Sequence, residues 1–178
     1  MRLSTIYYDK ALEFAQEVYD TNRDEYERRD QGDRDLVIRQ IANGKLAEWG
    51  AYIYILSTGS WCTAPDMNIY ESYNKSYDAD LKTKKYNVHV KSISSYNLER
   101  YGASWVFQKN DPIVTEPTIR DCVFFIAIGD NKESYEYTTF EVVKRCAATH
   151  LQGLYKPLRK KNLDSKVAIY LEDIIDMQ

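Results

Sequence analysis

Two stretches in the first third of the chain carry apolar residues at three- and four-residue steps, the spacing of a helix that buries one face. The first covers residues 9–19. The second covers residues 35–56, and its apolar residues are Leu36, Ile38, Ile41, Ala42, Leu46, Trp49, Ile53 and Leu56. Residues 21–35, which join the two, are rich in charge, and such a run is typical of a solvated face. The pattern therefore predicts a helical, charged N-terminal extension over residues 1–34 and a core over residues 35–178.

From residue 77 the apolar period changes to two, which is typical of a strand with one polar face. Residues 77–81 and 86–91 alternate in this way on either side of a lysine-rich turn, so they predict a β-hairpin. Residues 122–128 are continuously apolar and predict a central strand. We expect further strands at residues 104–108 and 134–138, a short helix at 140–150, and a final strand or helix start at 167–171. This order predicts an α/β fold, a mixed β-sheet flanked by α-helices.

The composition fits one domain with a core of its own. The chain has 178 residues, of which 44% are apolar and 29% are charged, so we expect a single domain over residues 1–178. No stretch approaches the roughly 20 apolar residues of a membrane-spanning helix, and the first residues do not resemble a signal peptide. We therefore expect no membrane contact and a cytoplasmic location. The cysteines, Cys62, Cys122 and Cys146, are odd in number and widely spaced, which favours small buried residues over a disulfide framework or zinc site.

The charge balance narrows the classes of partner. A formal net charge of −3 argues against a histone-like or general nucleic-acid coat protein, because such proteins carry a basic excess. A nucleic-acid enzyme is compatible with this charge, since it needs only a local positive surface around an acidic metal site. The sequence contains no glycine-rich phosphate loop, no nucleophile elbow and no HExxH motif.

Polar residues alternate along the predicted hairpin. Successive side chains of a strand point to opposite faces. Asp78 and Asp80 are therefore expected to share a face of the first strand, and Asn87, His89 and Lys91 to share a face of the second. If the turn lies at Lys84-Lys85, Asp80 faces His89 on the neighbouring strand, and Lys91 follows two residues further along the same face. The same alternation also fits the solvated face of an ordinary hairpin, where such pairs contribute about 0.2 to 1 kcal/mol. The pattern alone therefore leaves a reactive cluster and a solvated face both open.

Two features favour a reactive cluster. A carboxylate one strand away from a lysine is the minimum equipment for metal-assisted phosphodiester hydrolysis, because an oxygen ligand holds the ion and the lysine orients water or neutralises charge. In addition, Glu48 lies on the apolar stripe of the second predicted helix, an unusual place for a glutamate unless it points at a site.

The segments Gly44-x-x-x-Glu48, Asp80-Leu81 and Val88-His89-Val90-Lys91-Ser92 resemble the PD-(D/E)xK nuclease superfamily, which includes type II restriction enzymes, phage nucleases and mismatch-repair nicking enzymes. In that superfamily a helix glutamate precedes the core strands, an aspartate stands at the second strand, and a Glu-x-Lys pair ends the third. The resemblance covers roughly residues 35–95 and implies a restriction-endonuclease-like fold. It also implies a Mg²⁺ or Mn²⁺ cofactor, with Asp80 as central ligand, Glu48 as accessory ligand and Lys91 as catalytic lysine.

His89 departs from the superfamily pattern, which has an acidic residue or occasionally glutamine at this position. Imidazole is a poor ligand for magnesium and a better one for manganese, iron or zinc. Three explanations remain open. His89 ligates a softer ion or acts as a general base; Asp78 or Glu48 supplies the missing carboxylate; or the site has lost activity.

The leading hypothesis is a metal-dependent DNA endonuclease of restriction or phage type, which hydrolyses phosphodiester bonds with a metal-activated water. The residues expected to contact nucleic acid are Lys84, Lys85, Arg100, Trp105 and Gln108. By analogy with the superfamily, and because symmetric dimers are the commonest oligomers, a homodimer is expected. The alternative is a catalytically inactive protein of the same fold that binds nucleic acid or a protein partner, and an RNA substrate is a third possibility.

Overall fold

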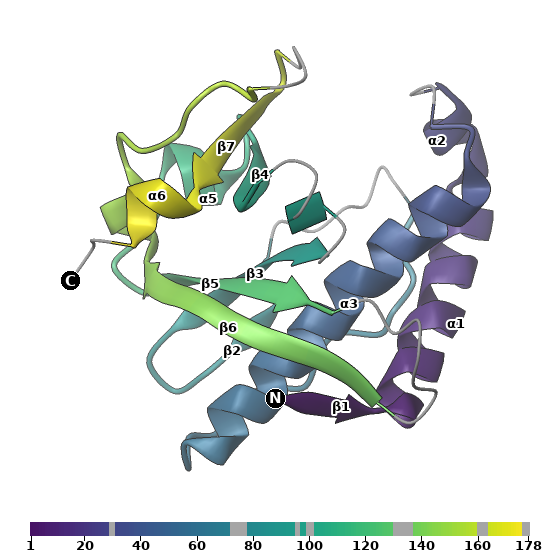
Figure 1. Ribbon diagram of the computed structural model, residues 1–178, viewed down its shortest axis with the longest axis horizontal. Helices are drawn as coiled ribbons and strands as arrows, with labels where there is room; N and C mark the ends of the chain where they lie inside the picture. Colours follow the sequence, from purple (N-terminus) through teal and green to yellow (C-terminus); the bar gives the residue numbers. More distant parts are fainter. Residues whose placement is uncertain are drawn as a thin grey trace.

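A computed structural model of the chain describes residues 1–28, 31–71, 78–94, 97–98, 102–129, 137–159 and 164–175. The N-terminal part consists of β1 (Arg2–Ser4), α1 (Thr5–Thr21), α2 (Arg23–Arg28) and α3 (Arg34–Ser57). The remainder consists of β2 (Leu81–Lys82), β3 (Asn87–Ser94), β4 (Ser104–Gln108), α5 (Pro112–Thr115), β5 (Asp121–Ile128), β6 (Tyr137–Ala147), the 3-10 helix η2 (Ala148–Leu151), β7 (Lys166–Tyr170) and α6 (Leu171–Ile174). Figure 1 shows the long helices α1 and α3 beside a curled mixed sheet, with β4, β7, α5 and α6 grouped away from them.

The main sheet has five strands in the order β1-β6-β5-β3-β2. Strands β3 and β5 run parallel, with His89 paired to Val123, and the other neighbours run antiparallel. Strand β5 lies in the middle, as its continuous apolar sequence predicts, because both of its faces are covered. Strands β4 and β7 form a separate two-stranded sheet.

The main sheet separates two apolar clusters. The cluster on the α3 face includes Leu46, Leu81, Val88, Phe124 and Phe140. The cluster on the opposite face includes Ile93, Trp105, Phe107, Val123 and Phe125. Alternation along β3 therefore directs Val88 and Val90 toward α3, whereas His89 and Lys91 project from the opposite face.

A side-chain cap and a close contact with the sheet fix the position of helix α3. Its N-cap is Asp33, whose side chain accepts the Leu36 N–H at 3.0 Å. Further along, Gly50 lies directly against the Phe140 ring of β6, and a Cβ there would come within 2.9 Å of a ring carbon. The missing side chain lets α3 approach the sheet closely, which sets the position of Glu48 two residues earlier.

Most of the predicted elements are confirmed. The helix expected at residues 35–56 is α3, the strand expected at 104–108 is β4, and the strand expected at 122–128 is β5. The segment 167–171 contains the end of β7 and the start of α6. The predicted hairpin is present as β2 and β3, but its first strand is shorter than expected. Of residues 77–81, residue 77 lies outside the described residues, and residues 78–80 are irregular, with bends at residues 78 and 80.

The helix expected at residues 140–150 is wrong, because residues 137–147 form strand β6 and only 148–151 form a 3-10 turn. The pairing of β5 with β6 shifts register between Phe125 and Ile126. This bulge sends Phe140 and Val142 to one cluster and Val143 to the other, so the strand lacks the clean two-residue period that would identify it. Residues 134–136 of the strand expected at 134–138 lie outside the described residues.

The N-terminal residues are part of the packed fold, which differs from the expected extension over residues 1–34. Strand β1 pairs with β6 at the edge of the main sheet, as Figure 1 shows beside the N-terminus. Helix α1 buries Ala11, Ala15 and Tyr19 at four-residue steps, and the last two share a cluster with Val37 and Ile38 of α3. Among the described residues, no helix combines the length and the apolar character needed to cross a membrane.

Candidate functional site

A pocket of about 500 Å³ lies between α1, α2, α3 and the segments that precede β2. Its walls are partly apolar, with Phe14, Val18 and Ile41 among them. Its described lining also holds one lysine, Lys45, and six carboxylate residues: Glu25, Glu48, Asp66, Glu71, Asp78 and Asp80. This excess of negative charge makes the pocket suited to a cation.

Lys45 and Glu48 lie one turn apart on α3 and form the innermost ion pair of the pocket. Lys45 Nζ donates to Glu48 Oε2 at 2.6 Å and to the Asp66 carbonyl oxygen at 2.8 Å. The same ammonium lies 4.4 Å from the centroid of the Phe14 ring. The side chain of Glu48 is only 15% exposed.

The carboxyl group of Glu48 is difficult to ionise. Burial, and then the negative charge of Asp80, raise its pKa to about 8, and the ammonium of Lys45 offsets these effects only in part. The pocket therefore does not readily hold Glu48 and Asp80 as two anions when Lys45 is the compensating charge. An additional cation would favour the ionised form of both.

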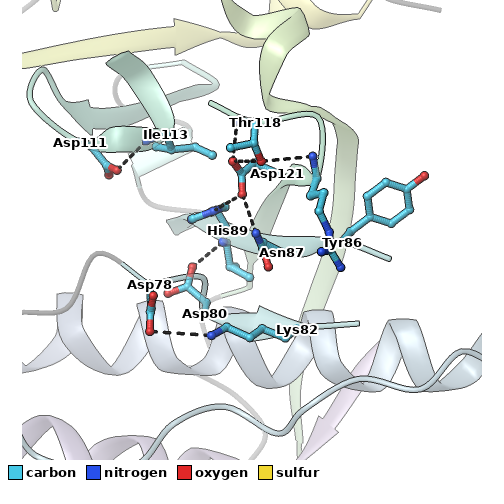
Figure 2. A network of polar contacts seen from close by, with 12 residues as sticks. Asp78, Asp80, Lys82, Tyr86, Asn87, His89, Asp111, Ile113, Thr118 and Asp121 are labelled. Carbon is cyan, nitrogen blue, oxygen red and sulfur yellow. Dashed lines mark hydrogen bonds and ion pairs between the residues drawn. The ribbon is translucent and has the colours of Figure 1, made fainter. Parts of the chain in front are cut away.

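Asp80 stands where the β2–β3 ladder ends. Its carboxylate accepts the backbone N–H of Val90 at 2.6 Å, so a side chain takes the place that a backbone carbonyl would have in a longer hairpin. Figure 2 shows this contact at the edge of β3. The structure thus brings Glu48 and Asp80 into one pocket from two separate elements, as the sequence predicts.

Asp78 occupies a different position from the one expected. The expectation that Asp78 and Asp80 share a strand face is wrong, because residues 78–80 are irregular and do not belong to a strand. Asp78 is 79% exposed and its carboxylate lies 3.8 Å from Lys82 Nζ. It therefore lies at the solvent side of the pocket.

His89 belongs to a separate hydrogen-bond network on the opposite face of the sheet (Figure 2). Its Nε2 lies 3.5 Å from Asp121 Oδ1. The same Asp121 carboxylate accepts the Asn87 side-chain N–H at 3.0 Å, and the Thr118 backbone N–H and hydroxyl at 2.7 and 2.8 Å. Burial opposes ionisation of Asp121, but the bonds from Thr118, Asn87 and His89 outweigh it and hold the pKa of the carboxyl below its ordinary value.

Lys91 has a partner of its own. Its Nζ lies 3.7 Å from Asp111 Oδ2 and 5.0 Å from the centroid of the Phe107 ring. The predicted single cluster of Asp80, His89 and Lys91 is therefore not formed in this structure. The cluster does not form because Asp80 turns its carboxylate to the edge of β3, whereas His89 and Lys91 project from the face away from α3.

The residues expected to contact nucleic acid are dispersed. Lys84 and Lys85 are exposed in the turn between β2 and β3. Trp105 is 1% exposed and packs on Phe125 with ring centroids 4.8 Å apart, which excludes the expected stacking on a base. Gln108 is half-buried at the end of β4, and Arg100 lies outside the described residues.

Four residues with clear structural roles escaped the sequence reasoning: Lys45, Asp66, Asp111 and Asp121. For Lys45 a signal was present, since a lysine three residues before a glutamate on a helix is a typical ion-pair spacing. For Asp121 the adjoining apolar run of β5 was the more visible feature, and its partner His89 is 32 residues away in sequence.

The Asp121 network leads to a stability prediction. Asp121→Ala removes an acceptor shared by Thr118, Asn87 and His89 and leaves donors in a mostly buried place, so we expect a loss of about 2–4 kcal/mol in the free energy of unfolding. Urea unfolding at pH 7 measures this loss. The matched control Asp78→Ala changes an exposed carboxylate and should remain within about 0.5 kcal/mol of wild type. Equal stability of both variants would show that the network does not stabilise the fold.

The pocket residues can be tested against the chemistry of a divalent cation. In the part of the chain that the structure describes, no group of three or more His, Cys, Asp or Glu residues is arranged to hold a metal ion. Glu48 and Asp80 nevertheless supply carboxylate oxygens to one pocket. Mg²⁺ prefers oxygen ligands and is commonly held by one or two carboxylates, with water and substrate phosphates as the other ligands. The pair therefore fits Mg²⁺ or Mn²⁺.

Comparisons with models of protein families, with curated proteins and with solved structures find no match for this chain. The fold class and the pocket that Glu48 and Asp80 share are therefore the basis on which a function is proposed.

Proposed function

We propose that the chain is a divalent-metal-dependent DNA endonuclease with a restriction-endonuclease-like fold. The observation that carries the proposal is the meeting of buried Glu48 from α3 with Asp80 at the edge of β3. The order of helix glutamate, hairpin aspartate and His89-x-Lys91 agrees with the superfamily resemblance, and β5 follows as a parallel neighbour of β3.

In this proposal Glu48 and Asp80 hold the cation. The Val90 N–H fixes the Asp80 carboxylate at the strand edge, and Lys45 fixes Glu48 from the same helix. A bound Mg²⁺ or Mn²⁺ supplies Lewis-acid polarisation of the phosphodiester and makes water more acidic at neutral pH. Because the pKa of Glu48 is about 8, this carboxyl gives up its proton when the cation binds near neutral pH.

His89 and Lys91 flank Val90 on β3, so they adjoin the residue that anchors Asp80. Lys91 Nζ forms an ion pair with Asp111 Oδ2 at 3.7 Å and its side chain is 24% exposed, so a substrate phosphate would compete with Asp111 for this ammonium. For His89 we favour the explanation that Glu48 supplies the missing carboxylate. Glu48 shares the pocket with Asp80, while His89 is bonded to Asp121 on the other face.

Cleavage of plasmid DNA tests the proposal. Purified protein with Mg²⁺ or Mn²⁺ should convert supercoiled plasmid to nicked and linear forms, and EDTA should stop the reaction. Gel electrophoresis over time measures both products, and a homodimer that cuts both strands in one encounter would yield linear DNA early. Absence of cleavage of double-stranded, single-stranded and branched DNA with both ions would contradict the endonuclease function.

A second candidate is a catalytically inactive protein of the same fold that binds nucleic acid or a protein partner. The pairing of His89 with Asp121 and of Lys91 with Asp111 favours it, because both side chains already have structural partners. Calorimetric titration with Mn²⁺ separates the two candidates. Stoichiometric binding that is lost in Asp80→Asn supports the endonuclease, and absence of binding supports the inactive protein.

A further inference from the structure

We infer that the β2–β3 turn and the loop before β5 form one contact surface for the backbone of duplex DNA. We call this surface the basic edge and define it by Lys84, Lys85, Tyr86, Ile119 and Arg120. The inference adds Arg120, Ile119 and Tyr86 to the two lysines noted in the sequence. It rests on the proposed function, because it assumes that the substrate is DNA.

Hydrogen bonds join the two segments of the basic edge. Arg120 Nε donates to the Lys85 carbonyl oxygen at 3.3 Å, and the Asn87 N–H donates to the Arg120 carbonyl oxygen at 2.8 Å. Within the turn, the Thr83 hydroxyl oxygen accepts the N–H groups of Lys85 and Tyr86 at 3.2 and 2.8 Å. The turn and the loop are therefore preorganised relative to each other, which lowers the entropic cost of binding.

Further hydrogen bonds connect the loop before β5 to the Asp121 network. The Arg120 N–H donates to the Thr118 hydroxyl at 3.3 Å, and Thr118 in turn donates to the buried Asp121 carboxylate. The Asp121 network described above thus supports the basic edge from the sheet side. A supported loop presents Ile119 and Arg120 in one defined arrangement.

Charge and exposure indicate the kind of partner. All five residues are exposed, and none of the ion pairs between described residues involves Lys84, Lys85 or Arg120. Ile119 is 84% exposed and Tyr86 is 50% exposed, and Figure 2 shows the Tyr86 ring pointing away from the polar network. Cations beside exposed apolar and aromatic side chains match a duplex, which offers phosphates next to sugars and base edges.

The basic edge lies close to the candidate site along the chain. Lys84 follows Asp80 by four residues, so their Cα atoms are at most about 14 Å apart. One DNA strand rises about 3.4 Å per nucleotide, so a strand at Asp80 reaches the basic edge within about four nucleotides. The cations also offset the repulsion between DNA and the acidic pocket.

Fluorescence anisotropy with a labelled 20-base-pair duplex in EDTA tests the inference without cleavage. The variant Lys84→Ala/Lys85→Ala/Arg120→Ala should lower affinity at least tenfold at low salt and reduce the slope of log K against log salt by about 2.7, since each phosphate contact contributes about 0.9. Arg120→Ala alone should reduce the slope by about 0.9, and Arg120→Lys should retain it because the charge remains. Lys10→Ala, which removes an exposed lysine of α1, is the matched control and should leave the slope unchanged.

The outcomes separate this inference from the endonuclease proposal. An unchanged salt slope in a folded Arg120→Ala variant would overturn the basic edge even if the wild type cleaves DNA. A reduced slope in a protein that does not cleave would support the basic edge and contradict the endonuclease. Binding of an acidic protein without any measurable duplex binding would also overturn the inference. Thermal unfolding of each variant confirms that it is folded.

Discussion

If the proposed endonuclease function is correct, Asp80→Asn should abolish plasmid cleavage, with an expected loss of about 10³-fold or more, while the protein remains folded. The amide oxygen of asparagine can still accept the Val90 N–H that Asp80 accepts at 2.6 Å, so the end of the β2–β3 ladder is preserved. The neutral amide is a much weaker cation ligand than a carboxylate. Cation binding supplies several kcal/mol of transition-state stabilisation, and about 4 kcal/mol corresponds to about 10³-fold in rate.

The rate of nicking of supercoiled plasmid in Mg²⁺ and in Mn²⁺ measures this loss, and thermal unfolding checks the fold. Asp78→Asn is the matched control, because it makes the same chemical change at an exposed aspartate two residues away. It should retain activity within about threefold, given the usual small effect of surface substitutions. Loss of activity in Asp78→Asn with full activity in Asp80→Asn would place the ligand at Asp78 and contradict the proposed site.

Local sequence patterns predicted the elements with uninterrupted apolar periods. Helix α3 and strand β5 belong to this class, because each keeps one pattern along most of its length. The approach of Glu48 to Asp80 was also predictable. A glutamate among the apolar residues of a helix is expected inside the fold, and Asp80 lies just before β2, where the chain enters the sheet.

The remaining features depend on contacts between distant residues. The bulge in β6 opposite Phe125 and Ile126 interrupts the two-residue apolar period of that strand. No residue near the bulge indicates its presence in the sequence. The Asp80 carboxylate turns to the Val90 N–H because β2 begins only at Leu81, a boundary that the hairpin alternation does not reveal. The partners of His89 and Lys91 come from β5 and from the N-cap of α5. Such long-range partners are set by tertiary packing, which a local pattern does not contain.

Glu48→Gln should stabilise the metal-free protein at pH 8 and remove the contribution of Glu48 to the pH dependence of stability between pH 5 and pH 8. The pKa of Glu48 is about 8 in the folded protein, against an ordinary value of 4.5. Between these values the folded state keeps a proton that the unfolded state has lost, so wild-type stability falls as pH rises through this window. A shift of this size corresponds to a loss of about 3–5 kcal/mol by pH 8, which glutamine avoids because it does not ionise.

Urea unfolding in EDTA at pH 5, 6, 7 and 8 measures this effect as the difference between the two proteins. Other titrating groups contribute to both curves and cancel, and the glutamine oxygen can still accept the Lys45 hydrogen bond. Glu17→Gln on the exposed side of α1 is the control and should give a curve parallel to wild type. If the free energy of unfolding changes with pH in the same way for Glu48→Gln and wild type, Lys45 keeps Glu48 ionised between pH 5 and pH 8. In the proposed site a bound cation would displace the Glu48 proton, so added Mn²⁺ should restore stability to the wild type at pH 8 and should have much less effect on Glu48→Gln.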